Sequence, residues 1–180
     1  MRKTFFLILT ALLTMPVFSQ RNVDYGASLG VTTYLGDINQ GNLLYHPRPA
    51  GQLFVRYNFN QRQALRLNLL AGYVSASDLD FNNPVQQLRA HSFETTVGEL
   101  GLNYEFNFFP YSTEMAKKID YTPYLAAGIA VSATGNNGFT IFPSVPFSLG
   151  MKVNIYRNIG IEAEYGFRKT FYDNFDGLKD

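Results

Sequence analysis

Apolar and polar residues alternate with a period of two along most of the chain. This period is typical of β-strands, because successive side chains point to opposite faces of a sheet. Helical periodicity is almost absent after the first twenty residues. The alternation predicts strands over these ranges: Val23 to Tyr34, Gly51 to Phe59, Leu65 to Tyr73, Glu99 to Phe108, Tyr121 to Ser132, Phe147 to Ile155 and Ile159 to Arg168.

The predicted strands and their connections are typical of a membrane barrel. Strands of about nine to twelve residues are long enough to cross a bilayer when tilted, and strands of soluble proteins are usually shorter. We therefore predict an all-β fold, a small antiparallel up-and-down transmembrane barrel of the OmpA/OmpX type. Short turns at Asn60 to Arg62 and Tyr156 to Asn158 alternate with long polar loops at Tyr34 to Pro49, Ser75 to Ser92 and Ser132 to Pro143.

The first twenty residues, MRKTFFLILTALLTMPVFSQ, have the organisation of a secretory signal peptide. Two basic residues precede an apolar run from Phe5 to Leu13, and Ser19 occupies the position before the cleavage site. A membrane anchor is the alternative, but the run is short for a spanning helix. We expect residues 1–19 to be a signal peptide and residues 20–180 to form one exported barrel domain.

The composition narrows the function classes. The chain has 180 residues, which is one domain's worth, and a formal net charge of +1. No basic cluster interleaves with aromatic residues, so we expect no nucleic-acid partner. Cysteine is absent, which excludes disulfides, thiolate metal sites, cysteine nucleophiles and a lipid anchor on cysteine.

The polar face of the predicted strands carries balanced charges. Paired and hydrogen-bonded charges are tolerated in a narrow interior, whereas an unpaired buried charge costs several kcal/mol. Aromatic residues gather near strand ends on the apolar face, as in interfacial girdles. We therefore expect the apolar face to contact outer-membrane lipid. The alternative is a soluble lipocalin-like carrier, in which the apolar face points inward and the polar face points outward. The predicted polar network of the lumen comprises Arg56, Arg66, Glu99, Glu105, Lys152, Glu162, Glu164 and Arg168.

The two ends of the predicted barrel differ in charge. Acidic residues predominate in the long loops, and basic residues predominate at the short-turn, periplasmic end. A basic rim can dock a protein partner by electrostatic complementarity, although exposed turns also carry charge for solubility alone. The candidate partner-contact residues are Arg62, Lys117, Lys118 and Arg157.

The chain resembles the PorG-like family, the outer-membrane barrel of the type IX secretion and gliding machinery of Bacteroidetes. The resemblance runs from about Tyr25 to Asp176, through the stretches GASLGVTTYLGDIN, RPAGQLFVRYNFNQRQALRLNLLAGYVSASD, FNFFPY, YTPYLAAGIA and EYGFRKTFYDNFD. Its most specific residues are Tyr34, Leu35, Gly36 and Asp37, and then Gly166, Phe167, Arg168, Lys169 and Thr170.

The resemblance implies a structural barrel that ties the periplasmic ring of a secretion machine to the outer membrane. It implies no catalysis. We also expect no cofactor and no metal, and the sequence identifies no small-molecule substrate. Family members continue past the "DNFD" region to a further strand. Because bacterial single-chain barrels have an even strand number, we expect about eight strands, of which seven are visible. A truncated chain, a partner strand or a distorted sheet would each account for the difference, and we favour truncation.

An enzymatic alternative rests on the segment "RAHSFE". His91, Ser92 and Glu94 invite comparison with barrel hydrolases that act on lipid A. Adjacent residues of a strand point to opposite faces, however, so His91 and Ser92 cannot readily share a proton. His46 and Asp37 share a loop, but one histidine and one carboxylate do not make a metal site. We therefore expect a non-enzymatic protein.

Overall fold

The computed structural model describes residues 22–36, 45–80, 92–112, 121–135, 140–156 and 158–171. Within these ranges the chain is β-structure apart from one short 3-10 helix, η1 (Asp78–Asp80). No helix of the described residues is long and apolar enough to cross a membrane. The strands are β1 (Val23–Thr32), β2 (Arg48–Asn58), β3 (Gln63–Ser77), β4 (Ser92–Asn107), β5 (Tyr121–Thr134), β6 (Thr140–Tyr156) and β7 (Ile159–Thr170).

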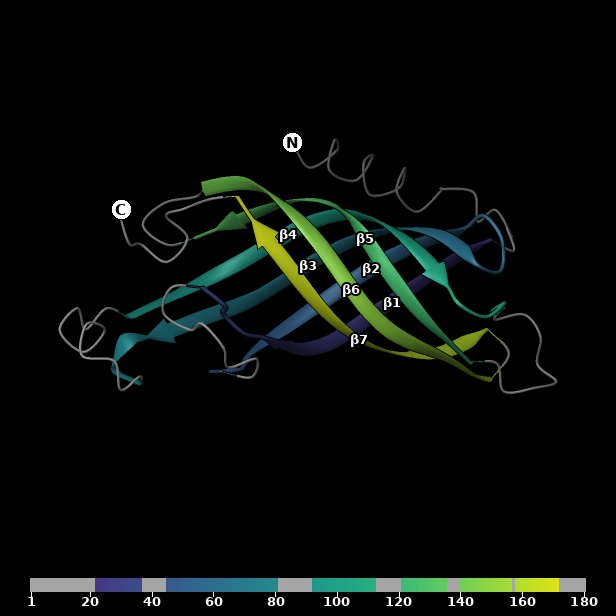
Figure 1. Cartoon of the computed structure of the whole chain (residues 1–180), viewed down its shortest axis with the longest axis horizontal. Helices are drawn as coiled ribbons and strands as arrows, with labels where there is room; N and C mark the ends of the chain where they lie inside the picture. The colour runs from purple at the N-terminus through teal and green to yellow at the C-terminus, as the bar shows by residue number, and fades with distance from the viewer. Residues whose placement is uncertain are drawn as a thin grey trace, which may run out of the picture.

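The strands form one antiparallel sheet in chain order, from β1 to β7. The sheet curls so that β5, β6 and β7 lie across from β1, β2 and β3 (Figure 1). Side chains of β2 and β7 meet inside the curl, where Arg56 bonds Glu162. The predicted all-β, up-and-down architecture with seven visible strands is therefore confirmed, and the barrel is incomplete. Its open edges are β1 and β7.

Six antiparallel pairings connect the seven strands. Each pairing reverses the direction of the chain, so β1 and β7 run in the same direction. Both strands begin at the end of the sheet that carries the turns after β2 and β6. A direct β1–β7 pair would be parallel, which explains why an odd number of strands does not close an antiparallel barrel.

An asparagine residue stabilises each of the two short turns, after β2 through its side chain and after β6 through its backbone conformation. Asn60 Oδ1 accepts hydrogen bonds from the backbone N–H groups of Arg62 and Gln63 at 2.8 and 2.9 Å. This side chain replaces a backbone acceptor and fixes the reversal between β2 and β3. Asn158, between β6 and β7, has a φ of 64°, a left-handed conformation that asparagine tolerates better than most residues.

β6 begins earlier than the alternation indicates, at Thr140 instead of Phe147. The predicted polar loop ended at Pro143, and Pro143 and Pro146 have no N–H to donate to a ladder. Pro143 nevertheless pairs with Val131 of β5, and no bridge partners occur between the pairs Ala127–Phe147 and Ala130–Ser144. The sheet thus accommodates Pro146 by interrupting the ladder locally, and the long-loop side has shorter loops than predicted.

Gly128 of β5 occupies a place where the backbone of β4 comes close. A Cβ atom at Gly128 would overlap the carbonyl oxygen of Leu102, whereas a Cβ at Gly98 of β4 would meet nothing within 4 Å. We predict that Gly128→Ala lowers the free energy of unfolding by about 1–3 kcal/mol. Gly98→Ala is the matched control and stays within about 0.5 kcal/mol of the parent.

Urea unfolding in detergent micelles, followed by tyrosine fluorescence, measures both variants. Equal stability of the Gly128→Ala and Gly98→Ala proteins would contradict the close approach of β4 and β5.

Candidate functional site

The outer face of the sheet is apolar and exposed, and its inner face is polar and buried. Leu29 and Ile129 on the outer face are 95% and 70% exposed, whereas the inward-facing Arg66 is 1% exposed. In the central strands burial alternates residue by residue along β3, β4, β5 and β6. Aromatic side chains of the outer face pack edge to face within their strands, in the pairs Tyr57–Phe59, Phe106–Phe108 and Tyr165–Phe167.

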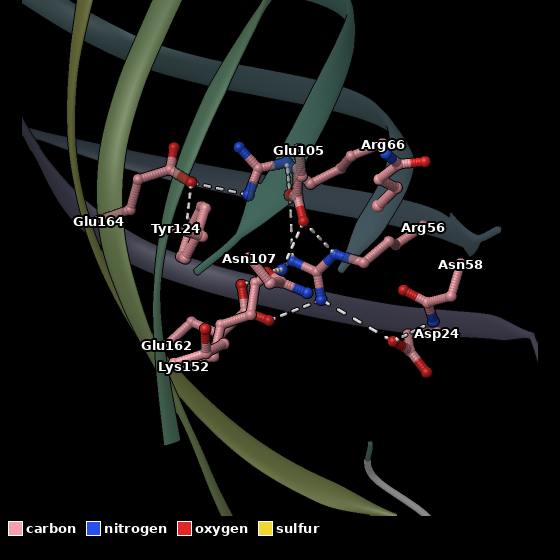
Figure 2. A network of polar contacts seen from close by, with 12 residues as sticks. Asp24, Arg56, Asn58, Arg66, Glu105, Asn107, Tyr124, Lys152, Glu162 and Glu164 are labelled. Carbon is pink, nitrogen blue, oxygen red and sulfur yellow. Dashed lines mark hydrogen bonds and ion pairs between the residues drawn. The ribbon is translucent and has the colours of Figure 1, made fainter. Parts of the chain in front are cut away.

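Glu105 of β4 is the centre of the inner face and is fully buried. Its carboxylate meets three cations, one from each of three other strands (Figure 2). Arg56 Nε lies 2.7 Å from Oε2, Arg66 Nε lies 3.0 Å from Oε1, and Lys152 Nζ lies 2.5 Å from Oε2. The Lys152 ammonium also donates to Asn107 Oδ1 at 3.1 Å. This shared carboxylate ties β2, β3 and β6 to β4.

Two carboxylates of β7 complete the arginine contacts across the lumen. Arg56 donates to both oxygens of Glu162, from Nη1 at 2.6 Å and from Nη2 at 2.8 Å. Arg66 Nη1 lies 2.7 Å from Glu164 Oε2, and the Tyr124 hydroxyl donates to the same oxygen at 2.5 Å. Charge-assisted and bidentate contacts are the strong class of hydrogen bond. The edge strand β7 is therefore held to β2 and β3 from within.

A smaller group lies toward the long-loop end. Arg168 Nε of β7 donates to Glu99 Oε1 of β4 at 3.1 Å. The hydroxyl groups of Ser132 and Ser144 lie 2.7 Å apart, and Ser132 donates to Glu99 Oε2 at 3.3 Å. The structure thus brings the eight charged residues predicted for the lumen into two groups, one around Glu105 and one around Glu99.

Some members of the network were not singled out from the sequence. Asp24 Oδ2 lies 3.9 Å from Arg56 Nη1 and accepts a hydrogen bond from Asn58. The Phe54 ring lies under the Arg56 guanidinium at 4.8 Å, a cation–π geometry. A Cβ atom at Gly26, the β1 partner of Phe54, would overlap that ring. The period-two pattern places all these residues on the inner face, but it does not say which of them meet.

An apolar cluster lies at the long-loop end. Tyr34 and Phe93 pack edge to face with ring centroids 5.1 Å apart. The Tyr45 hydroxyl donates to Asp80 Oδ2 at 2.6 Å and accepts from the Ser77 N–H at 3.0 Å. Burial and the neighbouring Asp80 carboxylate raise the pKa of Tyr45 to about 12, so its phenol stays a donor at neutral pH. The buried members are Tyr34, Tyr45, Val74, Ala76 and Phe93.

The residues of the family resemblance have distinct surroundings. A Cβ atom at Gly36 would overlap the phenol of the buried Tyr34. A Cβ at Gly166 would lie 3.2 Å from Arg168 Nη1, so the glycine leaves room for the arginine that reaches Glu99. Lys169 is exposed on the outer side of β7. The first part of the motif, with Tyr34 and Gly36, therefore belongs to the apolar cluster. The second part, with Gly166 and Arg168, belongs to the charged lumen.

The basic rim is described only at Arg62, which is exposed and donates from Nη1 to the Phe108 carbonyl at 3.1 Å. This contact bridges the turn after β2 and the end of β4. The candidate residues that lie outside the described residues are Asp37, His91, Lys117, Lys118 and Arg157.

Two of the residues considered for chemistry, Glu94 and His46, have charged partners. Ser92 is exposed at the start of β4, and the half-exposed Glu94 lies 3.5 Å from Arg48 Nη2. His46 Nε2 lies 3.1 Å from Asp80 Oδ2 at the surface. Within the described part of the chain, no three His, Cys, Asp or Glu residues are grouped so that they could hold a metal ion.

The fold and the inner face define an incomplete antiparallel β-barrel with an apolar exterior and a lumen of paired charges. A family profile, Domain of unknown function (DUF6089), matches residues 2–180. The chain therefore belongs to the DUF6089 family. Neither a curated protein nor a solved structure matches the chain.

Glu105 provides a direct test of the network. We predict that Glu105→Leu lowers the free energy of unfolding by about 3–5 kcal/mol, because it leaves buried cations without their shared counter-charge. Glu94→Leu is the matched control, since Glu94 makes an exposed contact with Arg48 and its loss costs under about 1 kcal/mol.

Urea titration and the heat-dependent mobility of the protein in detergent gels are the two measurements. Equal stability of the Glu105→Leu and Glu94→Leu proteins would contradict a stabilising role of the network.

Proposed function

We propose that the protein is a non-enzymatic structural barrel of the outer membrane that anchors a periplasmic protein assembly. More specifically, we propose that this assembly is the ring of a type IX secretion system, as the resemblance to the PorG-like family implies. The partners are then outer-membrane lipid and periplasmic ring proteins.

The membrane location is supported by the distribution of polarity. Apolar residues of the outer face are exposed around the sheet, and the buried inner positions include many charged and polar residues beside smaller apolar groups. In water this arrangement would expose apolar surface and bury charge, and both are unfavourable. In lipid the outer residues contact hydrocarbon and the inner charges satisfy one another. This inversion is the observation that carries the proposal.

The anchoring role is supported by the small size of the barrel and by the rim. A barrel of about eight strands has an interior that side chains fill, which suits an anchor better than a diffusion pore. The Glu105 group ties β2, β3, β4 and β6 to one another. Arg62 presents a positive charge beside the first short turn, on the side where a basic rim would meet a periplasmic partner.

The location is tested by fractionating cells that express the full chain with its signal sequence. We expect the protein in the outer-membrane fraction, resistant to carbonate extraction and with heat-dependent gel mobility. Recovery in the soluble periplasmic fraction would contradict the membrane proposal and favour the carrier alternative.

Unchanged lipid A on substitution of Ser92 with alanine is expected for a non-enzymatic barrel, and altered lipid A would favour the hydrolase.

The partner is tested by charge reversal at the rim. We predict that the double substitution Lys117→Glu and Lys118→Glu reduces crosslinked co-purification of periplasmic ring proteins by at least about tenfold, because complementary charge is lost. Lys169→Glu is the matched control, since Lys169 lies near the opposite end of the barrel, in β7. Equal co-purification by both variants and the parent would count against docking through the rim.

A further inference from the structure

The short turn after β2 carries a cation that lies outside the ion-pair network. Arg62 is exposed, and its Nη1 atom donates to the Phe108 carbonyl oxygen at 3.1 Å. Within the part of the chain that the structure describes, no carboxylate pairs with Arg62. Because a guanidinium has five N–H donors, most of them stay open to an anion from outside the barrel. The other described arginines all contact carboxylates: Arg48, Arg56, Arg66 and Arg168.

The turn holds this cation in a fixed place. Asn60 Oδ1 accepts from the backbone N–H groups of Arg62 and Gln63, and the Arg62 carbonyl oxygen accepts from the Asn107 N–H at 2.7 Å. Asn60 Nδ2 also donates to Gln63 Oε1 at 3.2 Å. The Gln63 side chain is thereby oriented by its oxygen, which leaves its Nε2 group as a donor. One turn thus presents a guanidinium and an amide donor.

Beside this turn, the outer face has aromatic rings on both sides of β3 but none at the start of β3 itself. The exposed rings are the edge-to-face pairs Tyr57–Phe59 at the end of β2 and Phe106–Phe108 at the end of β4. Between them, Gln63 and Leu65 are half-buried, and Leu67 is 48% exposed. Gln63 pairs with Phe106, and Leu65 pairs with Tyr57. We call Leu65 and Leu67 the β3 strip.

The order of these groups matches the order of groups in a phospholipid. The Arg62 cation and the Gln63 amide come first, and charge-assisted contacts with arginine are a strong mode of phosphate binding. The aromatic pairs come next, and aromatic rings favour the interface between headgroups and hydrocarbon. The β3 strip continues into the apolar outer face. A free phosphate would use only the cation, so the combination favours a lipid.

We propose that the Arg62 turn and the start of β3 bind one phospholipid of the periplasmic leaflet. Arg62 contacts the lipid phosphate, Gln63 donates from its amide to the headgroup, and an acyl chain lies along the β3 strip between the two aromatic pairs. The recognised chemistry is the phosphate with its acyl chain. The inference rests on the proposed membrane location, to which it adds a particular lipid and the residues that hold it.

Native mass spectrometry of the full chain in detergent micelles measures the bound lipid. The probes are dioleoyl phosphatidylglycerol and dioleoylglycerol, which has the same acyl chains without the phosphate. We expect the phosphatidylglycerol to bind at least about fivefold more tightly, because one basic residue at a membrane surface contributes roughly that factor. Glycerol 3-phosphate has the phosphate without acyl chains, and it should not displace the lipid at equal concentration. Displacement by glycerol 3-phosphate would overturn the lipid assignment.

Substitution of the arginine tests the phosphate contact. We expect Arg62→Gln to lose about fivefold in affinity for phosphatidylglycerol and to bind dioleoylglycerol as the parent does. Glutamine can still donate to the Phe108 carbonyl, so the turn keeps its contact with the end of β4. Arg48→Gln is the matched control, since Arg48 is a partly exposed arginine near the long-loop end, where it contacts Glu94. Equal phosphatidylglycerol binding by the two variants would overturn the proposal.

Substitution of one aromatic ring tests the position of the acyl chain. We expect Phe59→Ala to weaken the binding of both lipids, because the chain loses a neighbour that does not depend on the phosphate. Tyr73→Ala is the matched control, since Tyr73 is an exposed outer ring near the other end of β3, and it should bind both lipids as the parent does. Equal binding by these two variants would contradict the assigned place of the chain.

A protein contact at the same arginine is the competing outcome. Arg62→Gln would then reduce crosslinked co-purification of periplasmic proteins but bind phosphatidylglycerol as the parent does, and the lipid site would be overturned. A protein that fractionates with the outer membrane, but whose lipid binding does not depend on Arg62, fails only this inference. Recovery of the parent in the soluble fraction would contradict the membrane proposal itself.

Discussion

The carboxylate of Glu105 accepts cations from β2, β3 and β6 while it is itself fully buried on β4. Moving charges out of water is expensive, and the cost is recovered only when geometry and hydrogen bonding are good. The three cations therefore depend on one anion, and the anion depends on all three. Because these groups come from separate strands, the interior is satisfied only when the sheet has curled.

The arginines extend this dependence across the lumen. Arg56 and Glu162 are 106 residues apart in the chain, yet they share two hydrogen bonds. A contact between β2 and β7 does not specify which neighbouring strands pair, because these two strands are not neighbours in the sheet. The hairpins are specified locally, by alternation and by turn residues such as Asn60. The network then selects the curled sheet over a flat one.

Much of this arrangement is predictable from a period of two. The alternation identifies all seven strands and assigns the eight charged residues predicted for the lumen to the inner face. The starts of β4 and β6 were placed too late in the chain, at Glu99 and Phe147 instead of Ser92 and Thr140. Pro143 and Pro146 weaken the ladder signal before Phe147, although the sheet absorbs them by a local interruption. The pairing of Arg56 with Glu162 was not predictable from the sequence. Contacts across a lumen depend on the tilt and curvature of the strands, and the alternation of residues along one strand gives no information about either.

Pairing the charges of the lumen and pairing the backbone groups of the sheet edges are two separate requirements. Ion pairs from Arg56 and Arg66 draw β7 toward β2 and β3, but side chains inside the barrel cannot pair the outward row of N–H and C=O groups on β1 and β7. In lipid each such group costs several kcal/mol when it has no partner. The interior network can therefore set the curvature of the sheet, while only the backbone of another strand can pair these edge groups.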